Sequence, residues 1–128
     1  MLTKVRSVGI YVSDQQRALE FYRDALGCEV VADVPMGEGE DAPRWIEVKL
    51  PADETKLLLF TPEGQENRIG ELSNVIFHCD DIERTYEELS AKGVQFSTKP
   101  EKASWGQWWA VFQDPDGNAY GLGLESEG

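Results

Sequence analysis

The chain repeats one pattern of secondary structure, and this repeat constrains the fold more than any other feature. Residues 5–14 (VRSVGIYVSD) alternate apolar with other side chains, as a strand with one buried face does, and residues 72–81 (LSNVIFHCDD) show the same alternation. The segment Ser7–Val12 aligns with Asn74–Cys79 without a gap. The sequence therefore predicts two modules with the same order of elements.

A helix is predicted after each of these strands. Residues 15–27 and 82–93 each place apolar side chains three and four positions apart, which gives a helix one apolar face. Gly27 and Gly93 fit the left-handed position that ends many helices. The candidate start signals are an N-cap at Asp14 and the capping boxes Ser13–Gln16 and Asp80–Glu83.

Three further strands are predicted after each helix. In the second half, the last two are joined by the tight turn DPDGN at residues 114–118. The fold class is therefore α+β, with two βαβββ modules at about 1–64 and about 70–127 in a single domain of residues 1–128. One helix covers only one face of each sheet, so we expect the two mixed sheets to form a half-barrel cleft with their other faces.

Charge and cysteine content narrow the location and the partners. The net charge is −12, and an acidic surface repels nucleic-acid phosphates and anionic lipid headgroups, so we expect neither partner. No apolar run approaches the ~18 residues of a membrane helix, and the N-terminal residues do not resemble a signal peptide. The two cysteines, Cys28 and Cys79, form no disulfide framework, which favours the cytoplasm.

Three stretches together resemble a known family. VGIYVSD followed by ALEFYRDALG, then VIFHCDDIERTYEELSAKGV, then FQDPDGN, is similar to the vicinal oxygen chelate superfamily, which includes glyoxalase I, bleomycin resistance proteins and extradiol dioxygenases. The resemblance covers nearly the whole chain. It implies paired βαβββ modules around a cleft, commonly assembled as a dimer, so we expect a homodimer.

The resemblance also implies four metal-ligand positions, where the family uses His, Gln or Glu. These positions fall on Ser7, Leu58, Asn74 and Gly121. Leucine and glycine supply no donor atom, and the neutral oxygens of serine and asparagine bind transition metals weakly. A catalytic metal needs about three protein ligands of imidazole, carboxylate or thiolate type. The sequence therefore predicts a member of the family without metal ligands and with no cofactor.

Strand alternation predicts which side chains line the cleft. The lining is expected to be aromatic with a few polar groups, a composition typical of a small-molecule site. The predicted ligand-binding residues are Ser7, Tyr11, Trp45, Leu58, Phe60, Asn74, Trp105, Trp109 and Gly121, and the candidate catalytic residues are Glu47 and His78. The favoured interpretation is a protein that binds a small aromatic or hydrophobic molecule in a Trp-rich cleft without a metal.

Three alternatives stay open, and with them the question of whether the protein is an enzyme. The first is a metal-dependent lyase or isomerase of the glyoxalase type, or a dioxygenase. The second is a metal-free acid–base isomerase that uses Glu47 or His78, each of which can carry a proton near neutral pH in a suitable environment. The third is a non-enzymatic dimeric interaction protein in which Trp45 and Trp109 occlude the cleft.

Overall fold

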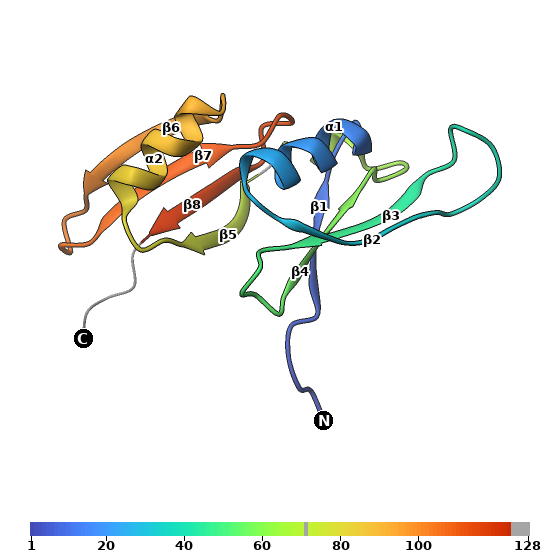
Figure 1. Cartoon of the computed structure of the whole chain (residues 1–128), viewed down its shortest axis with the longest axis horizontal. Helices are drawn as coiled ribbons and strands as arrows, with labels where there is room; N and C mark the ends of the chain where they lie inside the picture. Colours follow the sequence, from blue (N-terminus) through green and yellow to red (C-terminus); the bar gives the residue numbers. More distant parts are fainter. Residues whose placement is uncertain (71, 124–128) are drawn as a thin grey trace. The chain divides into compact units, whose positions relative to one another are not determined.

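The computed structural model describes residues 1–70 and 72–123, and they divide into two compact units. The first unit spans residues 1–69 and the second begins at residue 70, so the boundary falls between the two predicted modules. Each unit contains a four-stranded mixed sheet with a helix against one face (Figure 1). The α+β class and the two βαβββ modules are confirmed, whereas the half-barrel cleft stays a prediction.

The first unit is built around the sheet order β1-β4-β3-β2. Strand β1 is parallel to β4, and the other neighbours are antiparallel. The elements are β1 (Ser7–Tyr11), α1 (Gln15–Glu20), the π-helix η1 (Phe21–Ala25), β2 (Glu29–Pro35), β3 (Arg44–Lys49), β4 (Lys56–Phe60) and the 3-10 helix η2 (Glu66–Arg68).

The second unit has the equivalent sheet order, β5-β8-β7-β6. Its first strand, β5, is again parallel to the last strand, β8, and the other pairs are antiparallel. The internal repeat of the sequence is therefore a repeat of topology. The elements are β5 (Leu72–His78), α2 (Ile82–Ala91), β6 (Gln95–Lys102), β7 (Trp108–Gln113) and β8 (Ala119–Gly123). No helix among the described residues is long and apolar enough to cross a membrane.

The helices begin at aspartates, but not through the predicted capping boxes. The carboxylates of Asp14 and Asp81 accept the backbone N–H groups of Arg17 and Arg84, at 3.0 and 3.1 Å. Asp14 is the predicted competing N-cap. The predicted capping boxes started at Ser13 and Asp80, one residue too early, and are wrong because an N-cap side chain must reach the N–H three residues ahead.

The helix side of each sheet carries the core. In the first unit, Ile46 and Val48 of β3 and Leu57 and Leu59 of β4 are buried on the side of α1 and η1, whereas Leu58, between the last two, is half-buried. The same alternation in the second unit buries an aromatic cluster in which the rings of Phe112 and Tyr120 lie 5.5 Å apart. The predicted position of Phe112 under the helix is confirmed. The opposite faces of the two sheets are thus left for other contacts.

The DPDGN turn is held by a buried carboxylate. Asp114 accepts the backbone N–H groups of Asp116 and Asn118, both at 2.9 Å, and the Asn118 side-chain amide at 2.8 Å. The side-chain oxygen (Oδ1) of Asn118 then accepts the backbone N–H of Gly70 at 3.1 Å. Gly70 has φ of +85°, and a Cβ there would lie 2.6 Å from the carbonyl oxygen of Asp116. The turn therefore fastens the chain that enters β5 to the β7–β8 hairpin.

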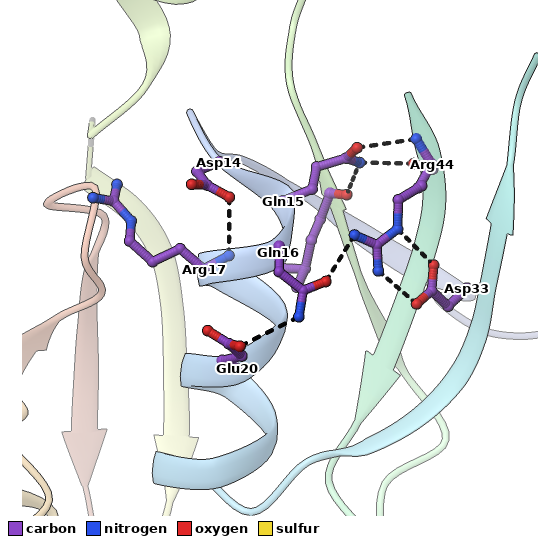
Figure 2. Close-up of polar contacts among 8 residues, drawn as sticks. Asp14, Gln15, Gln16, Arg17, Glu20, Asp33 and Arg44 are labelled. Carbon is purple, nitrogen blue, oxygen red and sulfur yellow. Dashed lines mark hydrogen bonds and ion pairs between the residues drawn. The ribbon is translucent and has the colours of Figure 1, made fainter. Parts of the chain in front are cut away.

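A glutamine at the start of α1 joins two strands of the first sheet. The Gln15 side-chain amide donates to the carbonyl oxygens of Arg44 and Leu59, at 2.7 and 2.9 Å, and accepts the N–H of Arg44 at 3.0 Å (Figure 2). The Arg44 guanidinium binds both carboxylate oxygens of Asp33, at 2.9 and 2.6 Å, and lowers the pKa of that carboxyl. These bonds fix the start of β3, which carries Trp45 and Glu47.

Candidate functional site

The second unit contains a pocket of about 320 Å³ lined by tryptophans. Trp105, Trp108 and Trp109 all contribute to it. It lies on the sheet face opposite α2, because Ala110 and Phe112, which alternate with Trp109 along β7, are buried in the core. Among the predicted ligand-binding residues, the structure brings Trp105, Trp109 and Gly121 together here, with the candidate catalytic residue His78.

Two glycines form the middle of the pocket floor. Gly121 on β8 pairs with Ile76 on β5, and Gly123 pairs with His78. A Cβ on Gly121 would lie only 3.1 Å from Cγ1 of Ile76, so the isoleucine side chain rests against this glycine. Ile76 is nonetheless 76% exposed. An apolar side chain thus lies beside the position where the family resemblance implied a metal-binding glutamate.

The polar groups near the pocket are few. His78 is about half exposed, and its Nε2 lies 3.4 Å from Oδ1 of Asp80. The Trp105 indole N–H donates to the Gln107 side-chain oxygen at 3.3 Å, and this indole is 70% exposed. A large, accessible aromatic surface with one imidazole at its edge is suited to binding flat apolar molecules.

The first unit groups other predicted residues on the face of its sheet opposite α1. The rings of Tyr11 and Phe60 meet edge to face, with centroids 4.8 Å apart, and the Arg68 guanidinium lies 5.1 Å from the centre of the Tyr11 ring. Ser7 and Leu58 are partly buried on the same face, as alternation predicts. These residues belong to the first unit, whereas the tryptophan pocket belongs to the second.

Glu47 is a buried carboxylate beside an indole. It is 6% exposed, and its Oε1 accepts the indole N–H of Trp45 at 2.8 Å. Lys49, on the same face of β3, directs its ammonium group to Glu29 at 3.4 Å. Glu47 is therefore held by a neutral donor. It lies in the first unit, and the other candidate catalytic residue, His78, lies in the second.

The family's metal positions hold no suitable donor set among the described residues. Ser7 and Leu58 lie in the first unit and Gly121 in the second, and the side chain of Asn74 lies outside the described residues. Within residues 1–70 and 72–123, no three His, Cys, Asp or Glu residues lie close enough to hold an ion. One hydroxyl, one isobutyl group and one glycine do not fit a divalent metal.

Both cysteines are in environments that disfavour the thiolate. Burial raises the pKa of the Cys28 thiol to about 11, with a smaller contribution from the negative charge of Asp53. Burial also raises the pKa of Cys79, whose Sγ lies 3.8 Å from the carbonyl oxygen of Gly123. Because the thiolate is the nucleophile, neither residue is prepared for covalent catalysis.

We expect Cys28 to resist thiol reagents in the folded protein. With its pKa near 11 and 5% exposure, its thiolate fraction at pH 8 is far below that of free cysteine. In the Cys79→Ser variant, reaction with Ellman's reagent at pH 8 should be at least about 100-fold slower than for free cysteine. One thiol per chain should react after unfolding. Rapid reaction of the folded variant would show that Cys28 is accessible and ionised.

A comparison of the sequence with known protein families agrees with this fold and this order of elements. Residues 4–122 match the model of the Glyoxalase/Bleomycin resistance protein/Dioxygenase superfamily, and the chain belongs to this superfamily.

Several relatives are similar over nearly their full length. The Bacillus subtilis (strain 168) protein YetH is 32% identical over 94% of this chain and 97% of its own. A member of the same superfamily from Sphaerobacter thermophilus DSM 20745 has a crystal structure with a TM-score of 0.86 and 35% identity, over 97% of this chain and 98% of that one. TnmS3, an antibiotic binding protein from Streptomyces sp. CB03234, gives 0.77 and 29%, over 98% of both chains.

The predicted site residues left out several that line the tryptophan pocket, among them Gln107, Trp108 and Leu122. Alternation places Trp108 on the helix side of β7, yet its side chain is 40% exposed and borders the pocket. The reason is its position as the first residue of the strand, beyond the part of the sheet buried in the core. The doublet Trp108–Trp109 was the available signal, because adjacent strand residues point to opposite faces and a side chain as large as an indole is rarely fully buried.

Proposed function

We propose that the pocket of the second unit binds a small planar aromatic molecule, uncharged or cationic, without a metal. The observation that carries this proposal is the convergence of Trp105, Trp108 and Trp109 on one cavity of about 320 Å³. Indole faces offer a large rigid contact area and attract both aromatic rings and cations. A volume of this size is at the lower end of small-molecule sites.

The charge of the protein favours the same class of ligand. The described pocket lining contains no lysine or arginine, and the net charge of the chain is −12. An anionic ligand would therefore meet repulsion without a compensating partner. The likeness to the antibiotic binding protein TnmS3 supports a role in binding rather than chemistry, although its ligand is not carried over. In this proposal the protein acts as a cytoplasmic homodimer, without nucleic-acid or membrane partners.

Binding should be visible at the indole N–H groups. We expect 2-naphthol, an uncharged planar probe, and proflavine, a planar cation, to shift the indole resonances of the pocket in ¹⁵N–¹H correlation spectra. Trp109→Ala should weaken binding at least about tenfold, because a buried aromatic contact is worth more than about 1.4 kcal/mol. Trp45→Phe, a change in the first unit, should leave the affinity unchanged, and so should dialysis against a chelator.

The opposite results would overturn the proposal. If neither probe perturbs the pocket indoles at millimolar concentration, the cavity is not an aromatic binding site. If binding is lost on chelation and restored by a divalent ion, the metal-free proposal fails and the metal-dependent alternative gains support.

Glu47 favours a second candidate, metal-free acid–base catalysis. Glu47 is a buried carboxylate whose Oε1 accepts a hydrogen bond from a neutral indole, so a general base shielded from water is available on β3. Turnover that survives chelation and is lost in Glu47→Gln, with the pocket indoles unaffected, would establish this candidate in place of simple binding.

A further inference from the structure

We propose that Gly123 selects the ligand of the tryptophan pocket by its thickness: one planar ring system stands on this glycine, between His78 and Trp109. This inference rests on the proposed binding function, and it narrows the chemical class of the ligand. The ligand would be a fused planar aromatic with an unsubstituted edge, whereas saturated rings would be rejected.

The strand register places the three residues in one row. Gly123 on β8 pairs with His78 on β5 and with Trp109 on β7, and all three line the pocket. Paired residues in neighbouring strands point to the same face of the sheet, so the imidazole and the indole stand on either side of the bare backbone of Gly123. The imidazole and the indole therefore form the two walls of a slot, and Gly123 forms its floor.

The width of the slot suits one ring. Neighbouring strands lie about 4.8 Å apart, so β5 and β7 are about 10 Å apart across β8. A ring in contact with both walls needs about 3.5 to 4 Å on each side, or about 7 to 8 Å in all, so one ring fits and contacts both side chains when they lean slightly toward it. Two stacked rings need about 11 Å and do not fit.

Neither packing nor backbone conformation requires a glycine at position 123. A Cβ placed there would meet no heavy atom within 4 Å, and its φ is not in the left-handed region. Gly121 differs, because a Cβ there would press on Ile76 at 3.1 Å. A glycine inside a strand weakens it and often marks a place where a ligand approaches the backbone closely. The missing side chain of Gly123 therefore keeps the slot open.

Gly123→Ala tests the inference, because it fills the slot without a clash in the free protein. The affinity for 2-naphthol, measured from the indole resonances, should fall about tenfold or more, as expected for a methyl group forced into an occupied space. The melting temperature should stay the same or rise, because alanine restricts the unfolded chain more than glycine does. Decahydro-2-naphthol, which has the same hydroxyl on saturated rings, should bind the wild-type protein at least about tenfold more weakly than 2-naphthol.

Val111→Ile is the matched control, because it adds one methylene on the same face of β7, beside Gly121 and outside the pocket lining. It should leave the affinity for 2-naphthol unchanged. Equal binding of 2-naphthol to the wild type and to Gly123→Ala, or equal binding of the planar and saturated probes, would overturn the slot while leaving the binding function intact. If neither probe shifts the pocket indoles of the wild type, both the slot and the proposed function fail.

Discussion

Asp114→Ala is expected to lower the free energy of unfolding by about 4 kcal/mol. The substitution removes at least three hydrogen bonds and leaves the N–H groups of Asp116 and Asn118, with the Asn118 amide, facing an apolar methyl group. Asp114 and Asn118 are both buried, so water does not readily replace the carboxylate. Each buried donor without a partner costs about 1–3 kcal/mol.

Urea denaturation followed by circular dichroism measures this loss. Asp114→Asn should lie between the wild type and Asp114→Ala, because an amide keeps one acceptor oxygen but opposes the Asn118 amide with a second donor. Asp81→Ala, which removes the N-cap of α2, provides a comparison and should cost about 1 kcal/mol. If Asp114→Ala lowers the free energy of unfolding no more than Asp81→Ala does, the hydrogen bonds of Asp114 contribute no more than a single N-cap.

Gln15→Leu is the second large effect, with an expected loss of about 3 kcal/mol. Leucine is similar in size but offers neither donor nor acceptor. The N–H and carbonyl groups of Arg44 and the carbonyl of Leu59 would lose partners at 3.0, 2.7 and 2.9 Å (Figure 2). Ile46 and Leu59 are the last paired residues of β3 and β4 at this end. The Gln15 side chain therefore connects the two strands beyond their last pair.

Gln16→Leu is the matched control for this effect. Gln16 is the next residue on α1, and its exposed side chain contacts Glu20 and the Arg44 guanidinium rather than the strand backbone. Its replacement should cost no more than about 0.5 kcal/mol. Equal midpoints of urea denaturation for the two variants would show that the Gln15 bridge contributes no more than a surface contact.

The sequence was sufficient to predict the strands and their faces because the alternation is regular. Val8, Ile10 and Val12 and their counterparts in the second module repeat at a period of two, which only a strand satisfies. The side on which each residue lies followed from the same period. The change from α1 to the π-helix η1 at Phe21 could not be predicted, because both geometries bury nearly the same apolar positions.

The candidate site was predicted less completely than the fold. Alternation gives the face on which Trp109 and Glu47 lie, but not how far a side chain leans or what covers it. The 6% exposure of Glu47 depends on tertiary packing and on the Trp45 indole, neither of which has a local signature. The functional interest of Gly123 became apparent only when the register placed it between His78 and Trp109.

The contact between Ile76 and Gly121 has a consequence for how such a chain can change over generations. A glutamate that arises at position 121 by a single substitution would have its Cβ about 3.1 Å from Cγ1 of Ile76 and would have to push that side chain aside. A smaller residue at position 76, if it appeared first, would remove this contact and ease the substitution. The order of mutational steps, and not only the availability of a carboxylate, therefore affects how readily a metal-binding glutamate could arise on β8.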